Sequence, residues 1–224
     1  INKGVLFLKQ YYSLLSSFAF FQGISQKDME QMLNCIGSFI QTYSKNTLLF
    51  SAGDILNSIG IVLEGSIQII YDDSFGNHSI LAEVTQGSLF GEAFVCAGKN
   101  TLPISIQCSA KSTILFLPYK KMITASYACH NQLIENMVQI LANKNILLNQ
   151  KVRYLSKRTT KEKLLSYLSD LAYQTGSKTI TIAFNRQELA DFLCVERSAM
   201  STALGKLKAE GIIDFHKNTF RLLS

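Results

Sequence analysis

Cationic and hydroxyl side chains gather on one face of a predicted helix near the end of the chain. Met200, Leu204 and Leu207 give this helix an apolar stripe, and Gly211 is a natural C-terminal stop. An arginine can fork onto guanine, and serine or threonine can bond base edges or phosphates, so the opposite face suits a DNA major groove. The polar face carries Arg197, Ser198, Ser201, Thr202, Lys206 and Lys208.

A second short helix is predicted immediately before it. Asn185 is a good N-cap, and Glu188 completes a capping box. Arg186 and Gln187 begin this helix, where a helix-turn-helix grips the DNA backbone. The alternative is a two-helix corner of an enzyme whose outer face is simply solvated.

The distribution of charge favours the DNA interpretation. The net charge is +6; residues 1–150 hold 9 Lys/Arg and 9 Asp/Glu, whereas residues 151–224 hold 13 and 7. The excess therefore lies in the segment with the helix-turn-helix pattern, and phosphate binding is a simpler account than a solvated basic face. Residues 212–223 read as a closing hairpin, a wing that can touch the DNA backbone through Lys217 and Arg221.

Cysteine and histidine usage indicates no metal site. The five cysteines include no CxxC pair, so neither a zinc site nor a disulfide framework is expected, and most should be reduced core residues. No histidine lies near another, which argues against a metalloenzyme. The residues are Cys35, Cys96, Cys108, Cys129, Cys194, His78, His130 and His216.

From its hydropathy, we expect the protein to be cytoplasmic. No run of about 20 uncharged apolar residues occurs, and Lys9 and several serines break the apolar N-terminal stretch. We therefore expect neither a membrane span nor a signal peptide.

In the first half of the chain, the predicted secondary structure changes from helix to strand near residue 39. Residues 1–38 look helical, with Ser25 and Asp28 capping one helix. From 39 to 118, short apolar or alternating runs are divided by Gly, Asp and Asn, which predicts an antiparallel sandwich or barrel. Residues 72–77 read as a hairpin tip.

One stretch of this β region has the character of a ligand site. Gly91, Glu92 and Ala93 follow a predicted strand, where they could offer backbone N–H groups and one carboxylate to a cavity. The alternative is that the glycine simply makes a tight corner.

A long helix follows, beginning near Lys120 or Asn131. Its heptad repeat has β-branched residues and one asparagine at one seam position and mostly leucine at the other, which favours a homodimer. The alternative is a helix buried in its own domain, because Leu133, Met137, Ile140 and Leu147 form a second stripe; both stripes can be used. The seam consists of Ile134, Val138, Leu141, Asn145, Leu148, Val152 and Leu155.

Residues 156–160 are the predicted hinge. Thr159 and Glu162 make a capping box for the next helix.

This order of parts resembles the cyclic-AMP receptor protein and fumarate–nitrate regulator superfamily of bacterial transcription regulators. The resemblance covers nearly the whole chain and rests on GDILNSIGIVLEGSIQII, SLFGEAFV, the long helix, and NRQELADFL with VERSAMSTALGKLKAEGII. It implies an α+β protein: N-terminal helices and a jelly-roll-like, cyclic-nucleotide-binding-domain-like β-roll sensor (1–119), a long dimerisation helix (120–156) and a winged helix-turn-helix (157–224).

The resemblance also implies how DNA is read. Arg197 matches a position that contacts guanine, and Ser198, Ser201 and Thr202 occupy the neighbouring base-reading and phosphate positions. Ser198 departs from the glutamate common there, so a different half-site sequence is expected within a palindromic operator. Cys194 stands where the turn often has glycine.

The effector implied by the resemblance is not cyclic AMP. Cyclic-AMP-binding members pair the phosphate with an arginine, but Ile104 stands there, and an apolar side chain cannot neutralise a buried phosphate. N-terminal cysteines for an iron–sulfur cluster are lacking before Cys35, and a haem would have to use His78. The resemblance implies an unknown small-molecule effector. The residues expected to bind it, called the effector set below, are Gly91, Glu92, Ala93, Ile104, Ser105 and Asn145.

The sequence thus predicts a homodimeric, sequence-specific DNA-binding transcription regulator that is not an enzyme and has RNA polymerase as a partner. Two alternatives come from other classes: a ligand-binding signalling module that acts through protein docking, and a cupin-like metal enzyme.

Overall fold

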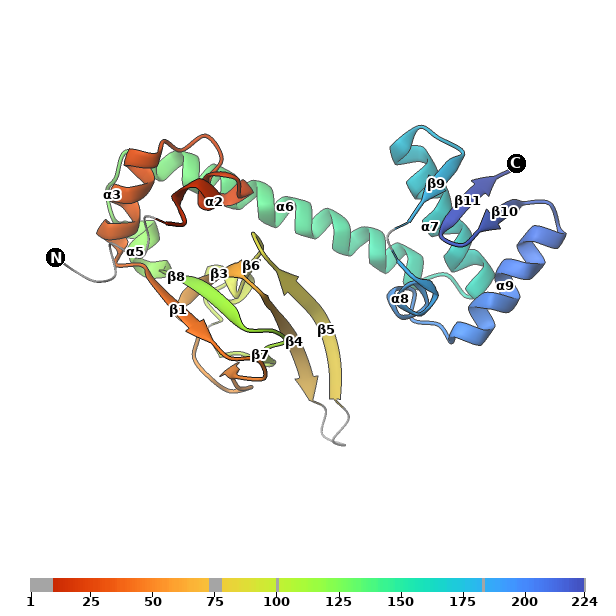
Figure 1. Cartoon of the computed structure of the whole chain (residues 1–224), viewed down its shortest axis with the longest axis horizontal. Helices are drawn as coiled ribbons and strands as arrows, with labels where there is room; N and C mark the ends of the chain where they lie inside the picture. Colours follow the sequence, from red (N-terminus) through yellow and green to blue (C-terminus); the bar gives the residue numbers. More distant parts are fainter. Residues whose placement is uncertain (1–9, 73–77, 100, 183, 224) are drawn as a thin grey trace. The chain divides into compact units, whose positions relative to one another are not determined.

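The computed structural model of the chain describes residues 10–72, 78–99, 101–182 and 184–223. It divides into two compact units, Ile1–Leu141 and Ala142–Ser224, and the division falls inside the long helix. Each unit is traced in Figure 1 and treated separately below. The predicted α+β class is confirmed. The predicted hairpin tip is residues 72–77, of which 73–77 lie outside the described residues.

The first unit begins with short helices whose ends are set by local signals. The Ser25 side chain accepts a hydrogen bond from the Asp28 backbone N–H at 3.1 Å, which confirms the predicted cap. The same helix ends at Gly37, whose φ of 68° is left-handed. These elements are α2 (Tyr12–Ser16), the 3-10 helix η1 (Ala19–Phe21) and α3 (Gln26–Ile36).

Two four-stranded antiparallel sheets form the β-roll of this unit, which confirms the predicted sandwich. One sheet has the order β1-β8-β3-β6: Phe39–Tyr43, Ser112–Pro118, Ser58–Glu64 and Leu89–Phe90. The other has the order β2-β7-β4-β5: Leu48–Phe50, Ser105–Cys108, Ser66–Asp72 and His78–Thr85.

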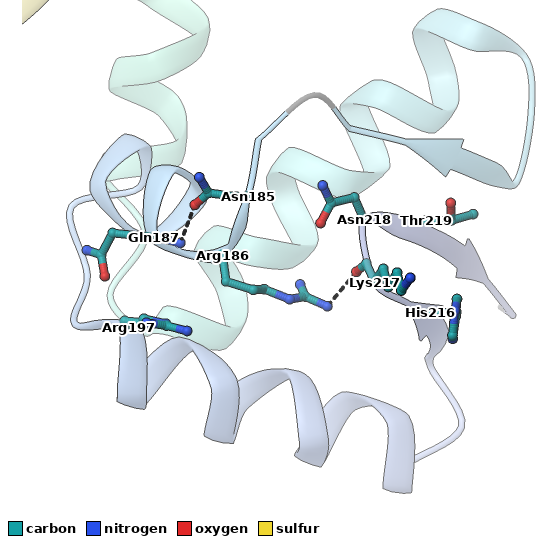
Figure 2. Close-up of a pocket in the computed structure, with 8 residues that line it drawn as sticks. All are labelled: Asn185, Arg186, Gln187, Arg197, His216, Lys217, Asn218 and Thr219. Carbon is teal, nitrogen blue, oxygen red and sulfur yellow. Dashed lines mark hydrogen bonds between the residues drawn. The ribbon is translucent and has the colours of Figure 1, made fainter.

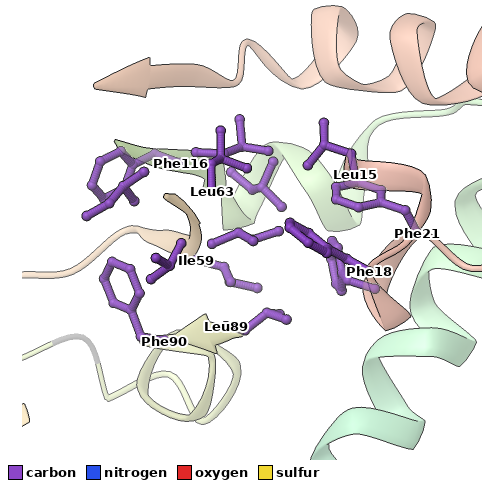
Figure 3. Packing of buried hydrophobic residues seen from close by; sticks show 14 of the residues in the cluster. Leu15, Phe18, Phe21, Ile59, Leu63, Leu89, Phe90 and Phe116 are labelled. Atoms are coloured by element: carbon purple, nitrogen blue, oxygen red, sulfur yellow. The ribbon is translucent and has the colours of Figure 1, made fainter. Parts of the chain in front are cut away.

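Aromatic rings fill the space between the strands and the N-terminal helices. Figure 3 shows Phe18, Phe21 and Leu15 at the helical end of the cluster, and Phe90 and Phe116 at its other end. The Phe90 and Phe116 rings meet edge to face, with centroids 6.3 Å apart. Residues in this cluster are almost fully buried, so the interior of the roll is packed with side chains.

One short helix lies between β6 and β7, two helices follow β8, and the long helix starts later than the earliest start predicted. These are α4 (Glu92–Cys96), α5 (Tyr119–Thr124) and α6 (His130–Leu155). Ala125 is extended, with ψ of 143°, and the Tyr127 hydroxyl donates to the Met122 carbonyl at 2.8 Å, so the chain breaks between α5 and α6. Of the two predicted starts, the one near Asn131 is confirmed.

A buried asparagine ties α6 to the N-terminal helices. The Asn136 amide donates to the carbonyls of Phe20 (3.0 Å) and Gln22 (2.8 Å). Leu133 and Met137 of the predicted second stripe are also buried, but Leu147 is 63% exposed. The prediction that Leu147 belongs to that buried stripe is therefore wrong.

The second unit holds a three-stranded sheet and three helices in addition to the end of α6. The predicted capping boxes at Thr159/Glu162 and Asn185/Glu188 are both present, and they begin α7 and α8. The elements are α7 (Thr160–Thr175), β9 (Thr179–Thr181), α8 (Arg186–Phe192), α9 (Arg197–Ala209), β10 (Ile213–His216) and β11 (Thr219–Leu222), with the sheet order β10-β11-β9.

The five cysteines differ in burial. Cys108 and Cys129 are buried and Cys96 is half-buried, and burial raises the pKa of all three thiols, which disfavours the thiolate. Cys35 and Cys194 are exposed, so the expected core positions are found at Cys108 and Cys129 and in part at Cys96. All five thiols are free.

In the part of the chain that the structure describes, no helix combines the length and apolar character needed to cross a membrane.

Candidate DNA-binding site

The candidate site begins with the packing of α8 against α9. Leu189 and Ala190 of α8 are fully buried in one cluster with Met200, Leu204 and Leu207 of α9. Their burial leaves the other face of α9 at the surface. The apolar residues that the sequence assigns to the inner face therefore fix which side chains face outward.

The turn between α8 and α9 places a side chain in a strained conformation. Cys194 has a φ of 50°, in the left-handed region that favours glycine. Lys163 of α7 supports this turn: its ammonium donates to the carbonyls of Leu193 (3.3 Å) and Cys194 (3.4 Å). Sequence reasoning missed Lys163, because no local pattern connects residues 30 positions apart.

A glycine at position 194 should relieve this strain. We expect Cys194→Gly to raise the melting temperature of the protein, because the gain of about 1–2 kcal/mol from the left-handed residue exceeds the chain-entropy cost of glycine, about 0.4–1 kcal/mol. Cys194→Val should lower it, since a β-branched residue is poorly tolerated at positive φ. Calorimetry of the three proteins measures this order; a lower melting temperature for the glycine variant would contradict the strain argument.

The outer face of α9 presents its polar groups to solvent. Within the described residues, no hydrogen bond or ion pair holds the Arg197 guanidinium. Ser201 and Thr202 donate their hydroxyl hydrogens to the carbonyls four residues earlier, at 3.0 and 3.1 Å. Their oxygen lone pairs remain available as acceptors. The exposed polar side chains of this face are Arg197, Ser198, Ser201, Thr202 and Lys206.

The last turn of α9 is different, because its lysine is already paired. Lys208 lies 2.6 Å from the Asp214 carboxylate, and its ammonium also lies 5.3 Å from the centre of the Phe215 ring. The hydrogen bond from Lys208 lowers the pKa of Asp214. The Lys208 side chain therefore contacts the first strand of the wing.

A groove lies beside the first turn of α9, between α8 and the wing. Its volume is about 660 Å³, and Figure 2 shows residues of α8, α9 and the β10–β11 turn around it. It brings together Arg186, Gln187, Arg197 and Lys217, four residues that the sequence assigns to DNA binding. The other four residues that line it are Asn185, His216, Asn218 and Thr219. Sequence reasoning assigned none of these four to DNA binding, although the last three lie within the predicted wing.

Arg186 points to the wing. Its Nη2 donates to the Lys217 carbonyl at 2.7 Å, and its guanidinium carbon lies 5.0 Å from the Phe215 ring centre and 4.9 Å from that of Phe220. Desolvation lowers the pKa of Arg186, although a guanidinium stays charged at neutral pH.

The predicted effector residues of the β-roll lie in differing surroundings. Gly91 has a φ of 78°, and a Cβ there would lie 2.3 Å from Leu56, so a tight corner is required. Glu92 and Ile104 are buried, at 4% and 6% exposure, whereas Ala93 is exposed. The three described cavities are lined by other residues.

The Ser105 and Asn145 side chains of the effector set both accept hydrogen bonds within the chain. The Ser105 hydroxyl accepts from the Ala52 backbone N–H at 3.2 Å. The Asn145 carboxamide accepts from the Asn149 side chain at 2.7 Å. The side chain of His78, the residue considered as a haem ligand, lies outside the described part.

The heptad seam of α6 is largely uncovered in the single chain. Val138 is 57% exposed, and Leu148 and Val152 are each 63% exposed. Asn145 is exposed as well, while Ile134, Leu141 and Leu155 are partly buried. Exposed apolar side chains in register along one helix are typical of a surface that meets a partner.

A β-roll, a 26-residue helix and a winged helix-turn-helix with an exposed cationic reading helix define a DNA-binding regulator with a sensor domain. Comparison with protein families agrees. The cyclic nucleotide-binding domain model matches residues 40–125, and the Crp-like helix-turn-helix domain model matches residues 162–224. The chain belongs to the Crp/Fnr family of transcription regulators.

The relatives are transcription regulators rather than enzymes. The cAMP-activated global transcriptional regulator CRP of Pasteurella multocida is 22% identical over 191 residues, covering 80% of this chain and 88% of the relative. The catabolite activator protein of Thermus thermophilus has a similar fold, with a TM-score of 0.54, 19% identity, and coverage of 91% of this chain and 93% of the other. CprK in complex with OCPA gives a TM-score of 0.64, with 17% identity and 87% and 92% coverage.

Proposed function

We propose that this chain acts as a homodimer that reads a palindromic DNA operator and responds to a small effector other than cyclic AMP. In this proposal residues 1–119 are the sensor, 120–156 the dimerisation segment and 157–224 the DNA-binding domain. The observation that carries the proposal is Arg197, which lies exposed at the start of α9 beside the groove, with its guanidinium unpaired among the described residues.

The chemistry of α9 supports base reading. The Arg197 guanidinium can donate two hydrogen bonds to the O6 and N7 atoms of one guanine. Because Ser201 and Thr202 already donate to carbonyls, they suit base-edge donors, such as the amino groups of adenine and cytosine. Ser198 is a third hydroxyl on this face, and Lys206 adds a cation further along it.

Groups around α9 would hold the DNA backbone. Lys217 in the wing and Gln187 in α8 line the same groove as Arg197. Phosphate contacts position a protein on the duplex, whereas base contacts specify the sequence. We assign Lys206 and Lys217 to phosphates, and Arg197 to a base.

The exposed seam of α6 supports a twofold dimer. In a symmetric dimer the same apolar stripe of each chain covers the other. The two copies of α9 would then enter successive major grooves about 34 Å apart, which requires a palindromic operator. Asn145 would fix the register of the seam.

The interior of the β-roll argues for an effector without a phosphodiester. Ile104 is 6% exposed and belongs to the core cluster, so its side chain offers no charge to a phosphate. The relatives differ in the small molecule that their names give: one is called cAMP-activated, and another is described in complex with OCPA. An effector held near Glu92 and Ser105 would act by binding one dimer geometry more tightly than another.

The cellular setting follows from this role. We propose a cytoplasmic regulator with RNA polymerase as its protein partner and with no catalytic residue or resident metal.

Selection of random duplexes by the purified protein tests the proposal. Three arms are compared: protein alone, protein with cyclic AMP, and protein with an extract of cell metabolites. We expect a palindrome with half-sites one helical turn apart, and equal enrichment with and without cyclic AMP. Enrichment that requires cyclic AMP would overturn the effector assignment. An unpaired half-site would overturn the dimer, and the absence of any motif in all arms would favour protein docking.

A further inference from the structure

The wing contains a turn that its own sequence does not favour. β10 and β11 pair from Ile213↔Leu222 to His216↔Thr219, so only two residues, Lys217 and Asn218, close the hairpin. Lys217 has a φ of 50°, a left-handed conformation that costs a non-glycine residue free energy. A contact from outside the hairpin can offset this cost.

Arg186 supplies that support from 31 residues away. Figure 2 shows its side chain reaching from the start of α8 to the wing, where Nη2 meets the Lys217 carbonyl at 2.7 Å. Two rings of the wing, Phe215 and Phe220, lie about equally far from the guanidinium, at 5.0 and 4.9 Å. The side chain thus contacts both strands of the wing and the turn between them.

These contacts need a guanidinium. Its planar group can stack on rings while its N–H groups point sideways to an acceptor, whereas an ammonium is a compact charge without that geometry. Nη1 is buried and makes no hydrogen bond within the described residues. Desolvation, which also lowers the pKa of Arg186, strengthens the contacts that remain.

We propose that Arg186 is a positioning residue that locks the wing turn onto α8, so that Lys217 is held at the groove beside Arg197. The proposal rests on the proposed DNA-binding function for its consequence, because a held wing presents Lys217 to the phosphate backbone. The clamp itself is a property of the chain without DNA.

Trypsin tests the clamp in the absence of DNA, because it cleaves after Lys217. Arg186→Met and Arg186→Lys are compared with the wild type, and Arg197→Met, in the same groove, is the matched control. We expect the ratio of cleavage after Lys217 to cleavage after Lys157 to rise about tenfold in both Arg186 variants and to stay unchanged in the control. General unfolding would raise cleavage at both sites, so the ratio is the readout. An unchanged ratio in Arg186→Met overturns the proposal.

A double-mutant cycle tests the consequence for DNA binding. We expect Arg186→Lys to weaken binding to the selected operator about tenfold in the wild-type background, but less than twofold when Lys217→Ala is already present. The charge is retained, so loss of a direct phosphate contact cannot explain such a result. Equal losses in the two backgrounds would make Arg186 an independent contact and overturn its action through Lys217. If no variant binds DNA, the proposed function fails, while the trypsin ratio still decides whether the clamp exists.

Discussion

We expect Leu148→Glu to make the protein monomeric and to abolish operator binding, while each chain stays folded. Leu148 is 63% exposed in the single chain, so a carboxylate there remains in water and leaves the fold of the chain intact. In the proposed twofold dimer the substitution appears twice, and both carboxylates would be buried in an apolar seam. At about 2 kcal/mol or more for each unpaired charge, the dimer dissociation constant should rise roughly 1000-fold. Sedimentation equilibrium measures this constant.

Asn143→Glu is the matched control for this prediction. Asn143 is also exposed on α6, but at a heptad position away from the seam of Val138, Leu141 and Leu148. The same new charge should therefore leave the dimer and its operator binding unchanged. If both variants dimerise like the wild type, α6 does not form the interface, and a palindromic operator loses its structural basis.

Local signals predict the boundaries of many elements because the deciding atoms lie within a few residues. Ser25, Thr159 and Asn185 each accept a hydrogen bond from a backbone N–H two or three residues later, and the structure begins a helix at each. Alternating apolar runs divided by glycine and polar residues predict the strands of the β-roll in the same way. The break before α6 is harder to predict, because residues 119–130 contain no glycine or proline to mark it.

Contacts between distant residues could not be predicted from local patterns. Lys163 supports the turn at Cys194, and Arg186 reaches Lys217, although each pair lies about 30 positions apart. The sequence identifies Arg186 as a cation at the start of a helix, but nothing local shows that its guanidinium lies against two rings of the wing. Folded packing therefore decides whether a cation faces solvent, as Arg197 does, or another element.

The interior of the β-roll illustrates a related limit. A glycine and a glutamate after a strand suit both a ligand site and a tight corner, and the sequence alone leaves the two open. Gly91 is required for the tight corner, because a Cβ at this position would lie 2.3 Å from Leu56. Burial of Glu92 and Ile104 shows that both side chains face the packed interior, where an effector would have to meet them. The corner at Gly91 and the buried carboxylate of Glu92 therefore come from two neighbouring residues, and one sequence signal serves both.

Arg197→Ala should relax the sequence preference of the protein as well as its affinity. Loss of a bidentate contact to guanine costs about 1–3 kcal/mol per half-site, and the loss should disappear on operators in which that base pair is already changed. Binding to the selected palindrome and to single-base variants of each half-site, measured by titration at fixed salt, gives this comparison. A uniform loss on all sequences would make Arg197 a phosphate contact.

Lys206→Ala is the comparison that separates a base contact from a phosphate contact. Lys206 is exposed on the same helix, and its removal should weaken binding to all these operators by a similar factor, with the salt slope reduced by about 1 for each half-site. Arg197→Ala and Lys206→Ala each remove one positive charge from α9, so a difference between their sequence profiles cannot come from net charge. It must come from what each side chain contacts. If the two variants give the same profile, α9 attracts DNA without reading it, and specificity has to be sought in the shape of the operator.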